Sequence, residues 1–261
     1  MHHGTDVQRE RFVAPVLRGK KVSALAITEP GGGSDVASLR TRADKDGDCY
    51  VVNGSKTFIT SGTRADFVTA AVRTGGAQHG GISLIIIEAD TPGYSVSKKL
   101  KKTGWWASDT AELSFEDCRV PAENLIGPEN AGFVAIMTNF TQERLLLAAQ
   151  CVAIAELALR EAHAYSKDRQ AFGRPIAGFQ VIRHKLADMS TRLAAARALT
   201  GELAMRYARG EQDPALAAQT KNAATDMLTF VADQAVQIHG GFGYMREYVV
   251  ERLYRDARLY P

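Results

Sequence analysis

The sequence is poor in cysteine, and the few cysteines that it has are far apart. Cys49, Cys118 and Cys151 form no CxxC pair, and no histidine lies near them at the spacing of metal ligands. Disulfide scaffolds and zinc modules use denser cysteine patterns, so this pattern indicates reduced thiols inside a cell and gives no metal site.

Long apolar runs and an excess of one charge are also missing. No stretch approaches the roughly 20 apolar residues that a membrane helix requires, which argues against a membrane span. The 32 basic residues nearly balance the 29 acidic ones, for a net charge of +3. Charge alone therefore does not favour nucleic acid as a partner, and no nucleic-acid motif is recognisable. A local basic patch for an anionic ligand stays open.

The remaining composition is that of an ordinary globular protein. The 261 residues are 45% hydrophobic and 23% charged, which suffices for one large domain or two modest ones. Residues 6–18 read as the end of a helix with no partner element before it, and the last residues follow an amphipathic segment. We therefore expect a fragment of a longer chain.

Between residues 22 and 126 the sequence alternates with a period of two. This pattern predicts strands at residues 22–28, 49–53, 56–60, 67–72, 82–88 and 111–115. Asp46-Gly47 and Asn53-Gly54 are typical of hairpin turns, because glycine supplies the positive φ that tight turns require. No long helical pattern interrupts the strands, so we expect an antiparallel β-barrel or β-sandwich rather than a dinucleotide-binding fold.

From residue 130 onward the period changes to about 3.6. Helices are expected over residues 143–167, 179–209 and 247–260, and another should begin at Asp213-Pro214 and end near residue 239. Long helices with short links indicate a four-helix bundle. The predicted fold class is therefore α+β, with a β-domain followed by a helical bundle.

Three segments contain residue types that could bind an anion or a ring. Residues 29–35 include three successive glycines and Ser34, which suit an anion-binding nest or a flexible β-turn. Residues 168–175 hold two arginines and a phenylalanine, which could bind a phosphate and stack on a ring, or form a solvated connection. Residues 240–243 contain more glycine than helix capping needs, which indicates close approach of a flat or phosphorylated group.

Glu143 is a candidate general base. In the predicted helix it lies at the start of a very apolar segment, where a carboxylate commonly stabilises the first turn. If the side chain faced an apolar cavity instead, it would suit proton abstraction. The sequence leaves both interpretations open.

Taken together and in order, these segments resemble the acyl-CoA dehydrogenase family of flavoproteins. The resemblance covers nearly the whole chain and rests on TEPGGGSD, NGSKTFITSG, AELSFEDCRVP with NLIGPENAGF, DRQAFGRPIAGFQVIRHKLADM and VQIHGGFGYMREYVVERLYRDAR. Within the family, AELSFEDCRVP and TQERLLLA are most similar to the long-chain-type branch.

The resemblance implies three domains and a reaction. Residues 1–21 would be the remnant of an N-terminal helical domain, 22–127 the middle β-domain that binds FAD and acyl-CoA, and 128–261 the C-terminal helical-bundle domain. The implied reaction removes the α and β hydrogens of an acyl-CoA thioester and yields trans-2-enoyl-CoA. Electrons would then pass from FAD to an electron-transferring flavoprotein.

The resemblance also implies which residues contact FAD. Those that would line the flavin and its pyrophosphate are Leu25, Ile27, Thr28, Gly33 and Ser34, with Phe58 and Thr60 against the isoalloxazine ring. Those that would reach the adenine and pyrophosphate of FAD in a neighbouring subunit are Arg169, Phe172, Gln180, Gln237 and Gly241. Ser34 would also touch the substrate.

The family carries its catalytic glutamate at one of two positions. The long-chain-like branch has it where this sequence reads Gln142-Glu143-Arg144, which makes Glu143 the expected base and Arg144 a substrate-binding neighbour. Many members carry it shortly after the RDAR-like segment, which here would lie beyond Pro261. In that case Glu143 would have a secondary role.

Two other functions stay open beside the dehydrogenase. One is an acyl-CoA oxidase of the same fold, with oxygen as acceptor, and the other is an inactive fragment or non-catalytic interaction module. The resemblance further implies a homo-oligomer, a tetramer or dimer, located in the bacterial cytoplasm or the mitochondrial matrix.

Overall fold

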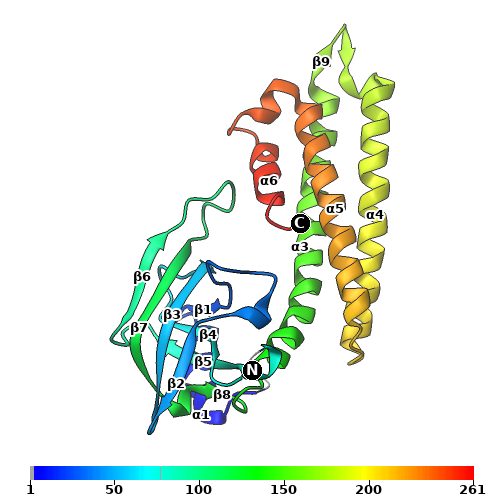
Figure 1. Cartoon of the computed structure of the whole chain (residues 1–261). Helices are drawn as coiled ribbons and strands as arrows, with labels where there is room; N and C mark the ends of the chain where they lie inside the picture. The colour runs from blue at the N-terminus through cyan, green and yellow to red at the C-terminus, as the bar shows by residue number, and fades with distance from the viewer. Residues whose placement is uncertain (1–2, 77) are drawn as a thin grey trace. The chain divides into compact units, whose positions relative to one another are not determined.

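The computed structural model describes residues 3–76 and 78–261, and the chain divides into two compact units (Figure 1). Unit 1 comprises Met1–Lys102 and Trp106–Thr138 and contains the large sheet. Unit 2 comprises Thr103–Trp105 and Asn139–Pro261 and contains the long helices. The architecture is thus mixed α+β. The domain boundaries expected after residues 21 and 127 stay predictions.

Unit 1 begins with a helical segment made of α1 (Asp6–Gln8), a π-helical turn η1 (Arg9–Val13) and α2 (Ala14–Leu17). Phe12 packs edge-on against Phe67 of the sheet, with ring centroids 5.0 Å apart. The side-chain amide of Gln8 donates to the carbonyls of Glu123 and Leu125. These buried contacts attach the segment firmly to unit 1.

The strands of unit 1 form one sheet in the order β6-β7-β3-β2-β4-β5-β8, and β1 pairs with β4 beside this path. Their bounds are β1 Ser23–Ala26, β2 Arg42–Asp46, β3 Cys49–Thr60, β4 Phe67–Arg73, β5 Ile82–Glu88, β6 Tyr94–Lys99, β7 Thr110–Pro121 and β8 Leu125–Ile126. Short 3-10 turns are η2 Val36–Ser38, η3 Gln78–Gly81 and η4 Ala122–Asn124.

The predicted antiparallel sheet is only partly correct. Most neighbouring strands are antiparallel, but β1 runs parallel to β4, and β2 meets β4 in one parallel pair, Arg42 opposite Arg73. Strands β6 and β8 end the path, and no pairing between described residues closes it into a barrel. β2, β6 and the short β8 were not predicted as strands.

The two expected hairpin turns have different outcomes. Asp46-Gly47 is confirmed, because β2 and β3 pair antiparallel up to Asp46 opposite Cys49 and Gly47 has φ +63°. Asn53-Gly54 is wrong, because β3 continues through it. Gly54 has φ +146° at a register shift against β7, so its conformational freedom serves a bulge instead of a reversal.

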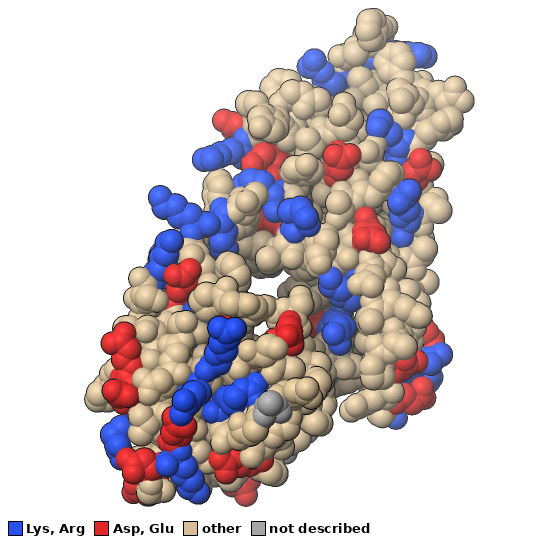
Figure 2. Space-filling view, in the orientation of Figure 1, with Lys and Arg blue, Asp and Glu red and all other residues tan. Residues whose placement is uncertain are grey.

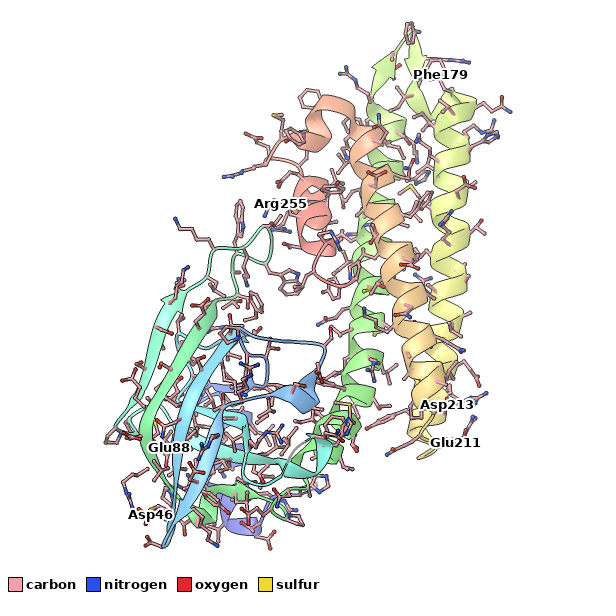
Figure 3. The ribbon with its side chains drawn as sticks, in the orientation of Figure 1. Asp46, Glu88, Phe179, Glu211, Asp213 and Arg255 are labelled. Carbon is pink, nitrogen blue, oxygen red and sulfur yellow. The ribbon has the colours of Figure 1, made fainter. Side chains whose placement is uncertain are left out.

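Unit 2 consists mainly of helices α3 (Gly132–Asp168, of which residues 132–138 belong to unit 1), α4 (Gln180–Ala208), α5 (Pro214–His239) and α6 (Val249–Ala257). The hairpin β9 (Gln170–Ala171) and β10 (Arg174–Pro175) and the turn η5 (Ile176–Gly178) join α3 to α4, and η6 (Gly240–Tyr244) follows α5. Asp213, labelled in Figure 3, accepts the N–H of Leu216 at 2.9 Å and caps α5 as the sequence predicts.

One core holds unit 2 together. Small residues of α3, among them Ala155 and Ala158, pack with Met189 of α4 and Leu228 of α5, all fully buried. Small side chains let the helices approach closely, while the larger ones fill the space between them. Trp105 packs on the same core, and its backbone N–H donates to Asp256 of α6 at 2.6 Å.

Surface charge follows the balance seen in the sequence. Figure 2 shows basic and acidic side chains interspersed over the face in view, without a large block of one sign. Among the helices that the structure describes, none is long and apolar enough to cross a membrane.

Candidate functional site

The glycine segment after β1 forms a loop with open backbone. Glu29 and Gly32 exchange backbone hydrogen bonds, each at 3.1 Å, which closes a tight turn. Cβ atoms added at Gly31 or Gly32 would meet nothing within 4 Å, and one at Gly33 would lie 3.4 Å from the Thr28 methyl group. Gly33 and Ser34 are exposed. The loop therefore presents its peptide groups to solvent, as an anion-binding nest requires.

Near its C-terminal end, β3 turns an aromatic ring outward beside this loop. The Thr57 N–H donates to the Thr28 carbonyl at 2.9 Å, which joins β3 to the end of the β1 segment. The register against β7 shifts between Lys56 and Ile59, and Phe58 has φ +59°. As a result Lys56 and Thr57 are both buried, whereas the Phe58 side chain is 68% exposed. A positive φ is strained for a bulky residue, and a large exposed ring indicates a contact surface.

Asp109 fixes the turn in which β3 ends. Its carboxylate accepts the backbone N–H and the hydroxyl of Thr63 and pairs with Arg64. Burial alone would raise the pKa of Asp109, but the hydrogen bonds from Thr63 and the charge of Arg64 lower it below the usual value. Thr60 lies exposed just before this turn.

The remaining predicted flavin residues of unit 1 differ in exposure. Leu25 lies on the exposed side of β1, where the strand alternates between exposed and buried residues, and Ile27 is buried. Hydrogen bonding thus brings the loop, Thr28 and β3 together, whereas Ile27 lies beneath the surface that they form.

An ion pair that the sequence did not reveal lies under the same loop. Lys56 is fully buried, and its Nζ lies 2.8 Å from Glu29 Oε1. Burial lowers the pKa of Lys56 to about 8, although the Glu29 carboxylate acts in the opposite direction. Lysine is normally solvated, so the residue type concealed this burial, although Lys56 continues the alternation of the buried Tyr50 and Val52.

In unit 2, the predicted arginine loop is a hairpin with an exposed tip. Phe172 has φ +51°, its side chain is 95% exposed, and its ring contacts Phe179 edge-on with centroids 6.0 Å apart. The guanidinium of Arg174 lies over the Phe179 ring at 4.3 Å. The hairpin therefore projects an apolar ring on a base stiffened by aromatic and cationic contacts.

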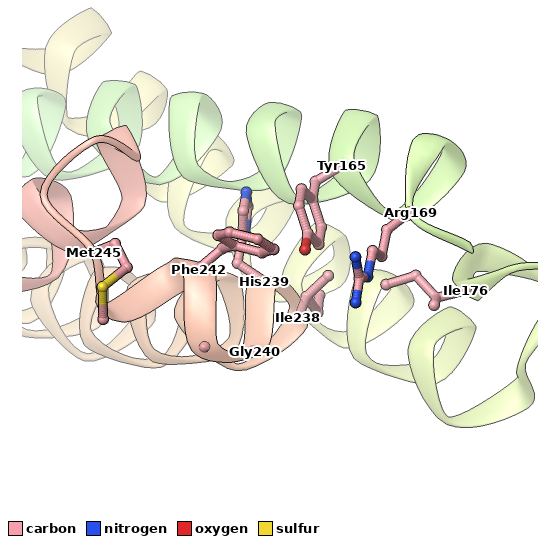
Figure 4. A pocket seen from close by; sticks show the side chains of 9 residues that line it. Tyr165, Arg169, Ile176, Ile238, His239, Gly240, Phe242 and Met245 are labelled. Carbon is pink, nitrogen blue, oxygen red and sulfur yellow. The ribbon is translucent and has the colours of Figure 1, made fainter. Parts of the chain in front are cut away.

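A groove of about 560 Å³ lies beside this hairpin (Figure 4). Its lining includes the two predicted residues Arg169 and Gly241, and Arg169 also lies 5.8 Å from the ring centre of Phe242. Of the other predicted residues, Gln237 is exposed on the last turn of α5, and Gln180 lines a different groove with His184 and Lys185. The structure therefore brings Arg169 and Gly241 together and leaves Gln180 outside their groove.

His239 forms the floor of that groove and was not predicted as a site residue. Its ring stacks on Tyr165 with centroids 4.2 Å apart, and Nδ1 lies 2.8 Å from the Ala235 carbonyl oxygen. Burial lowers the pKa of His239, while the Ala235 hydrogen bond and the charge of Glu161 act in the opposite direction. A neutral imidazole therefore fits this apolar position.

Glu143 lies in the interior of α3 and not at its start. The helix begins at Gly132, about three turns earlier, so the interpretation of Glu143 as a residue of the first helical turn is wrong. Its carboxylate is half-buried and accepts a hydrogen bond from the Asn139 amide at 2.6 Å. Arg144 is half-buried beside it. Within the described ranges, no group of His, Cys, Asp or Glu is arranged to hold a metal ion.

Family models match most of the chain. Residues 24–118 match the middle domain of acyl-CoA dehydrogenases, and residues 130–261 match their C-terminal domain. An acyl-CoA dehydrogenase of Bacillus subtilis is 44% identical over 99% of this chain and 69% of its own length. The long-chain specific mitochondrial acyl-CoA dehydrogenase of Rattus norvegicus is 40% identical over 100% of this chain, which spans only 61% of that relative.

Solved structures give the same result. A probable acyl-CoA dehydrogenase from Mycobacterium abscessus superimposes with a TM-score of 0.97 at 53% identity, over 99% of this chain and 69% of that one. Butyryl-CoA dehydrogenase from Megasphaera elsdenii has a TM-score of 0.95 at 42% identity, over 99% of this chain and 68% of that one. The predicted family is confirmed: the chain belongs to the acyl-CoA dehydrogenases.

Proposed function

We propose that the protein is an FAD-dependent acyl-CoA dehydrogenase that converts an acyl-CoA thioester to the trans-2-enoyl-CoA. The observation that carries the proposal is Phe58, whose exposed ring is held outward at a strained φ beside the open peptide groups of the glycine loop. Such a ring and such a loop fit a cofactor in which a flat ring is followed by a diphosphate.

The groove of unit 2 fits the second part of the same cofactor. Arg169 and the exposed backbone of Gly241 suit a phosphate, and the neighbouring Phe242 ring suits a base. In this proposal, Leu25, Ile27, Thr28, Gly33, Ser34, Phe58 and Thr60 hold the flavin, and Arg169, Phe172, Gln180, Gln237 and Gly241 reach the adenine end of FAD in a second copy of the chain. The exposed Phe172 tip supports this homo-oligomer, a dimer or tetramer.

The chain's own residues then supply the acid-base chemistry. Bound FAD would accept the β-hydrogen as hydride, and the protein must remove the α-proton. Glu143 is the proposed base, with one carboxylate oxygen oriented by Asn139 so that the other is available to the substrate. Arg144 would bind the substrate beside it. Backbone N–H groups would polarise the thioester carbonyl and make the α-proton more acidic.

Partners and cofactor are inferred from relatives. A solved structure whose description names the electron transferring flavoprotein of Acidaminococcus fermentans matches this chain with a TM-score of 0.96. A glutaryl-CoA dehydrogenase from Mycobacterium smegmatis was solved in complex with FADH2. We accordingly propose an electron-transferring flavoprotein as acceptor. By analogy with bacterial and mitochondrial relatives, we place the protein in the bacterial cytoplasm or the mitochondrial matrix.

The finer details of the fold belong to the same proposal. We infer a sandwich-like or barrel-like middle domain at residues 22–127 from the buried core between its strands, and a four-helix-bundle domain at 128–261 from the core that α3 to α6 share. Residues 1–21 would then be the remnant of an N-terminal helical domain.

One experiment tests the proposed reaction. The visible spectrum of the purified protein is recorded without oxygen, before and after addition of a long-chain acyl-CoA. We expect a flavin spectrum that bleaches with substrate in the wild type. Glu143→Gln should retain the flavin but not bleach, because an amide cannot take up the α-proton. Glu156→Gln is the matched control, since Glu156 is an exposed residue of the same helix that pairs with Arg197.

The outcomes separate the alternatives. Bleaching of Glu143→Gln at the wild-type rate would refute the assigned base, and a glutamate elsewhere would have to act. Wild-type protein without flavin would refute the cofactor proposal and favour an inactive fragment or interaction module. A prolyl acyl carrier protein oxidase is 32% identical with a TM-score of 0.94, which keeps oxidase as the second candidate. Hydrogen peroxide formed in air at the rate of turnover would favour it.

A further inference from the structure

The pair Lys56–Glu29 is buried at the joint between the two segments proposed to hold the flavin. Lys56 is fully buried and Glu29 nearly so, with side chains 0% and 10% exposed. Nζ of Lys56 donates both to Glu29 Oε1 at 2.8 Å and to the carbonyl of Ile27 at 3.0 Å. A charged ammonium in such a place is costly unless it is paired and hydrogen-bonded.

The Glu29 side chain, at the start of the glycine loop, binds the backbone at the end of the same loop. Its Oε2 accepts the backbone N–H of Arg40 at 2.6 Å, and its Oε1 accepts that of Thr41 at 2.9 Å. Thr41 Oγ1 in turn donates to the Ser55 carbonyl at 3.2 Å. One carboxylate thus closes the segment from 29 to 41, and the open glycines lie within the closed loop.

Lys56 connects this closed loop to the strand that carries Phe58. Its ammonium binds the loop through Ile27 and Glu29, and the next residue, Thr57, donates its N–H to Thr28 at 2.9 Å. Phe58 follows directly, at the register shift that turns its ring outward. The position of the ring relative to the glycines therefore depends on the contacts of Lys56.

We propose that Lys56 and Glu29 are positioning residues that hold the glycine loop and the Phe58 ring in one fixed geometry for the flavin. The role rests on the proposed flavin site. Stability alone does not account for the pair, because a buried ion pair is often no more stabilising than apolar residues of similar volume. Its hydrogen bonds to three backbone groups of the loop are what an apolar pair could not supply.

The test compares flavin binding with stability in Lys56→Met, Glu29→Gln, the double variant and Val68→Ala. Val68 is a fully buried residue of β4 in the core of unit 1, opposite Ala24 of β1 and Ile87 of β5, so its variant controls for loss of stability. We expect Lys56→Met and Glu29→Gln to weaken FAD binding at least tenfold and to shift the visible band of the bound flavin. Val68→Ala should lower the urea midpoint but keep the wild-type affinity and spectrum.

The double variant separates positioning from charge balance. It leaves no buried charge unpaired, so its urea midpoint should recover relative to the single variants, whereas its FAD affinity should stay low because the contacts of Lys56 are lost. Recovery of wild-type affinity and spectrum in the double variant would overturn the proposal.

Glu29→Asp keeps the proposal falsifiable if the neutral variants do not fold. Aspartate retains the charge but is one methylene too short to reach Lys56 and both backbone N–H groups together. We expect weaker FAD binding with a nearly unchanged urea midpoint, and wild-type affinity would overturn the positioning role. Wild-type protein that binds no FAD would refute the proposed flavin site itself. If wild type and variants bound FAD equally well, the flavin site would stand and only the positioning role would be refuted.

Discussion

Buried His239 should make the stability of the protein depend on pH in a window that a single substitution removes. The ring is 5% exposed, stacks on Tyr165 and meets Tyr248 edge-on at 5.8 Å. Glu161 is the charged group that acts on it. Burial lowers the pKa of His239 below the 6.5 of a free imidazole, and neither the Ala235 hydrogen bond nor Glu161 reverses this.

The direction and size of the effect follow from proton binding. As the pH falls below 6.5, the unfolded chain protonates this histidine while the folded chain still holds it neutral. The unfolded state then binds more protons, so the free energy of unfolding decreases as the pH decreases, by at most about 1.4 kcal/mol per pH unit. Above 6.5 both states are neutral at this residue and the effect vanishes.

Urea unfolding measures this effect as a difference between variants. We expect wild type to lose up to about 1.4 kcal/mol relative to His239→Leu for each pH unit from 6.5 down to the lowered pKa of the folded protein, and no more below it, since leucine has no proton to bind. All other titrating groups are present in both proteins and cancel. His163→Gln, a change at an exposed residue of α3, should follow the wild type. Parallel pH profiles for wild type and His239→Leu would refute the reasoning.

Three further substitutions, one of them with a matched control, test other parts of the structure. Arg169→Ala should reduce the amount of flavin bound per chain, because the groove loses its cation. The flavin extracted from the purified variant is measured, and an amount equal to that of the wild type would argue against this role of Arg169. Gly54→Ala should lower the free energy of unfolding by roughly 2–4 kcal/mol, measured with urea, because φ is +146° and the added Cβ would lie 2.6 Å from Thr41 Oγ1. Gly47→Ala is the control: it has open space around it and should cost only about 1 kcal/mol. Met189→Ala should cost about 2–5 kcal/mol by opening a cavity in the helical core, and a smaller loss would indicate that the core collapses around it.

Local signals predicted the helices better than the sheet. Asp213-Pro214 combines a capping carboxylate with a proline in the first turn, and α5 begins there. By contrast, the parallel pairing of β1 with β4 joins segments more than 40 residues apart, and no local pattern reports such a pairing. Strand β6 was missed because its residues are mostly exposed, so the alternation that marks a half-buried strand is absent.

The error at Asn53-Gly54 has a physical explanation. Asparagine-glycine between alternating residues is the usual signal of a two-residue hairpin, because both need positive φ. A bulge in a continuous strand has the same requirement, and here Gly54 meets it where Thr41 approaches too closely for a side chain. The close contact with Thr41, and not the local sequence, thus distinguishes the bulge from the hairpin turn, because both have the same sequence signal.

The candidate site was only partly visible in the sequence for a related reason. Motif residues such as Gly33 and Arg169 could be named because their type suits a phosphate. Lys56 could not, because lysine is rarely buried, and the partner that permits its burial, Glu29, lies 27 residues earlier in the chain. His239 could not either, since its neutral packing on Tyr165 depends on a helix more than 70 residues away in the chain.

Backbone strain in the two units supports a shared ligand-binding role. Phe58 in unit 1 and Phe172 in unit 2 both adopt positive φ, and both expose a large ring. Each feature costs free energy, on the order of 1–3 kcal/mol for the backbone alone, and an exposed ring contributes little to the core. The coincidence of strain and exposure at Phe58, expected to contact the flavin, and at Phe172, expected to contact the adenine end of FAD, is therefore consistent with the proposed ligand, because contact with it would offset both costs.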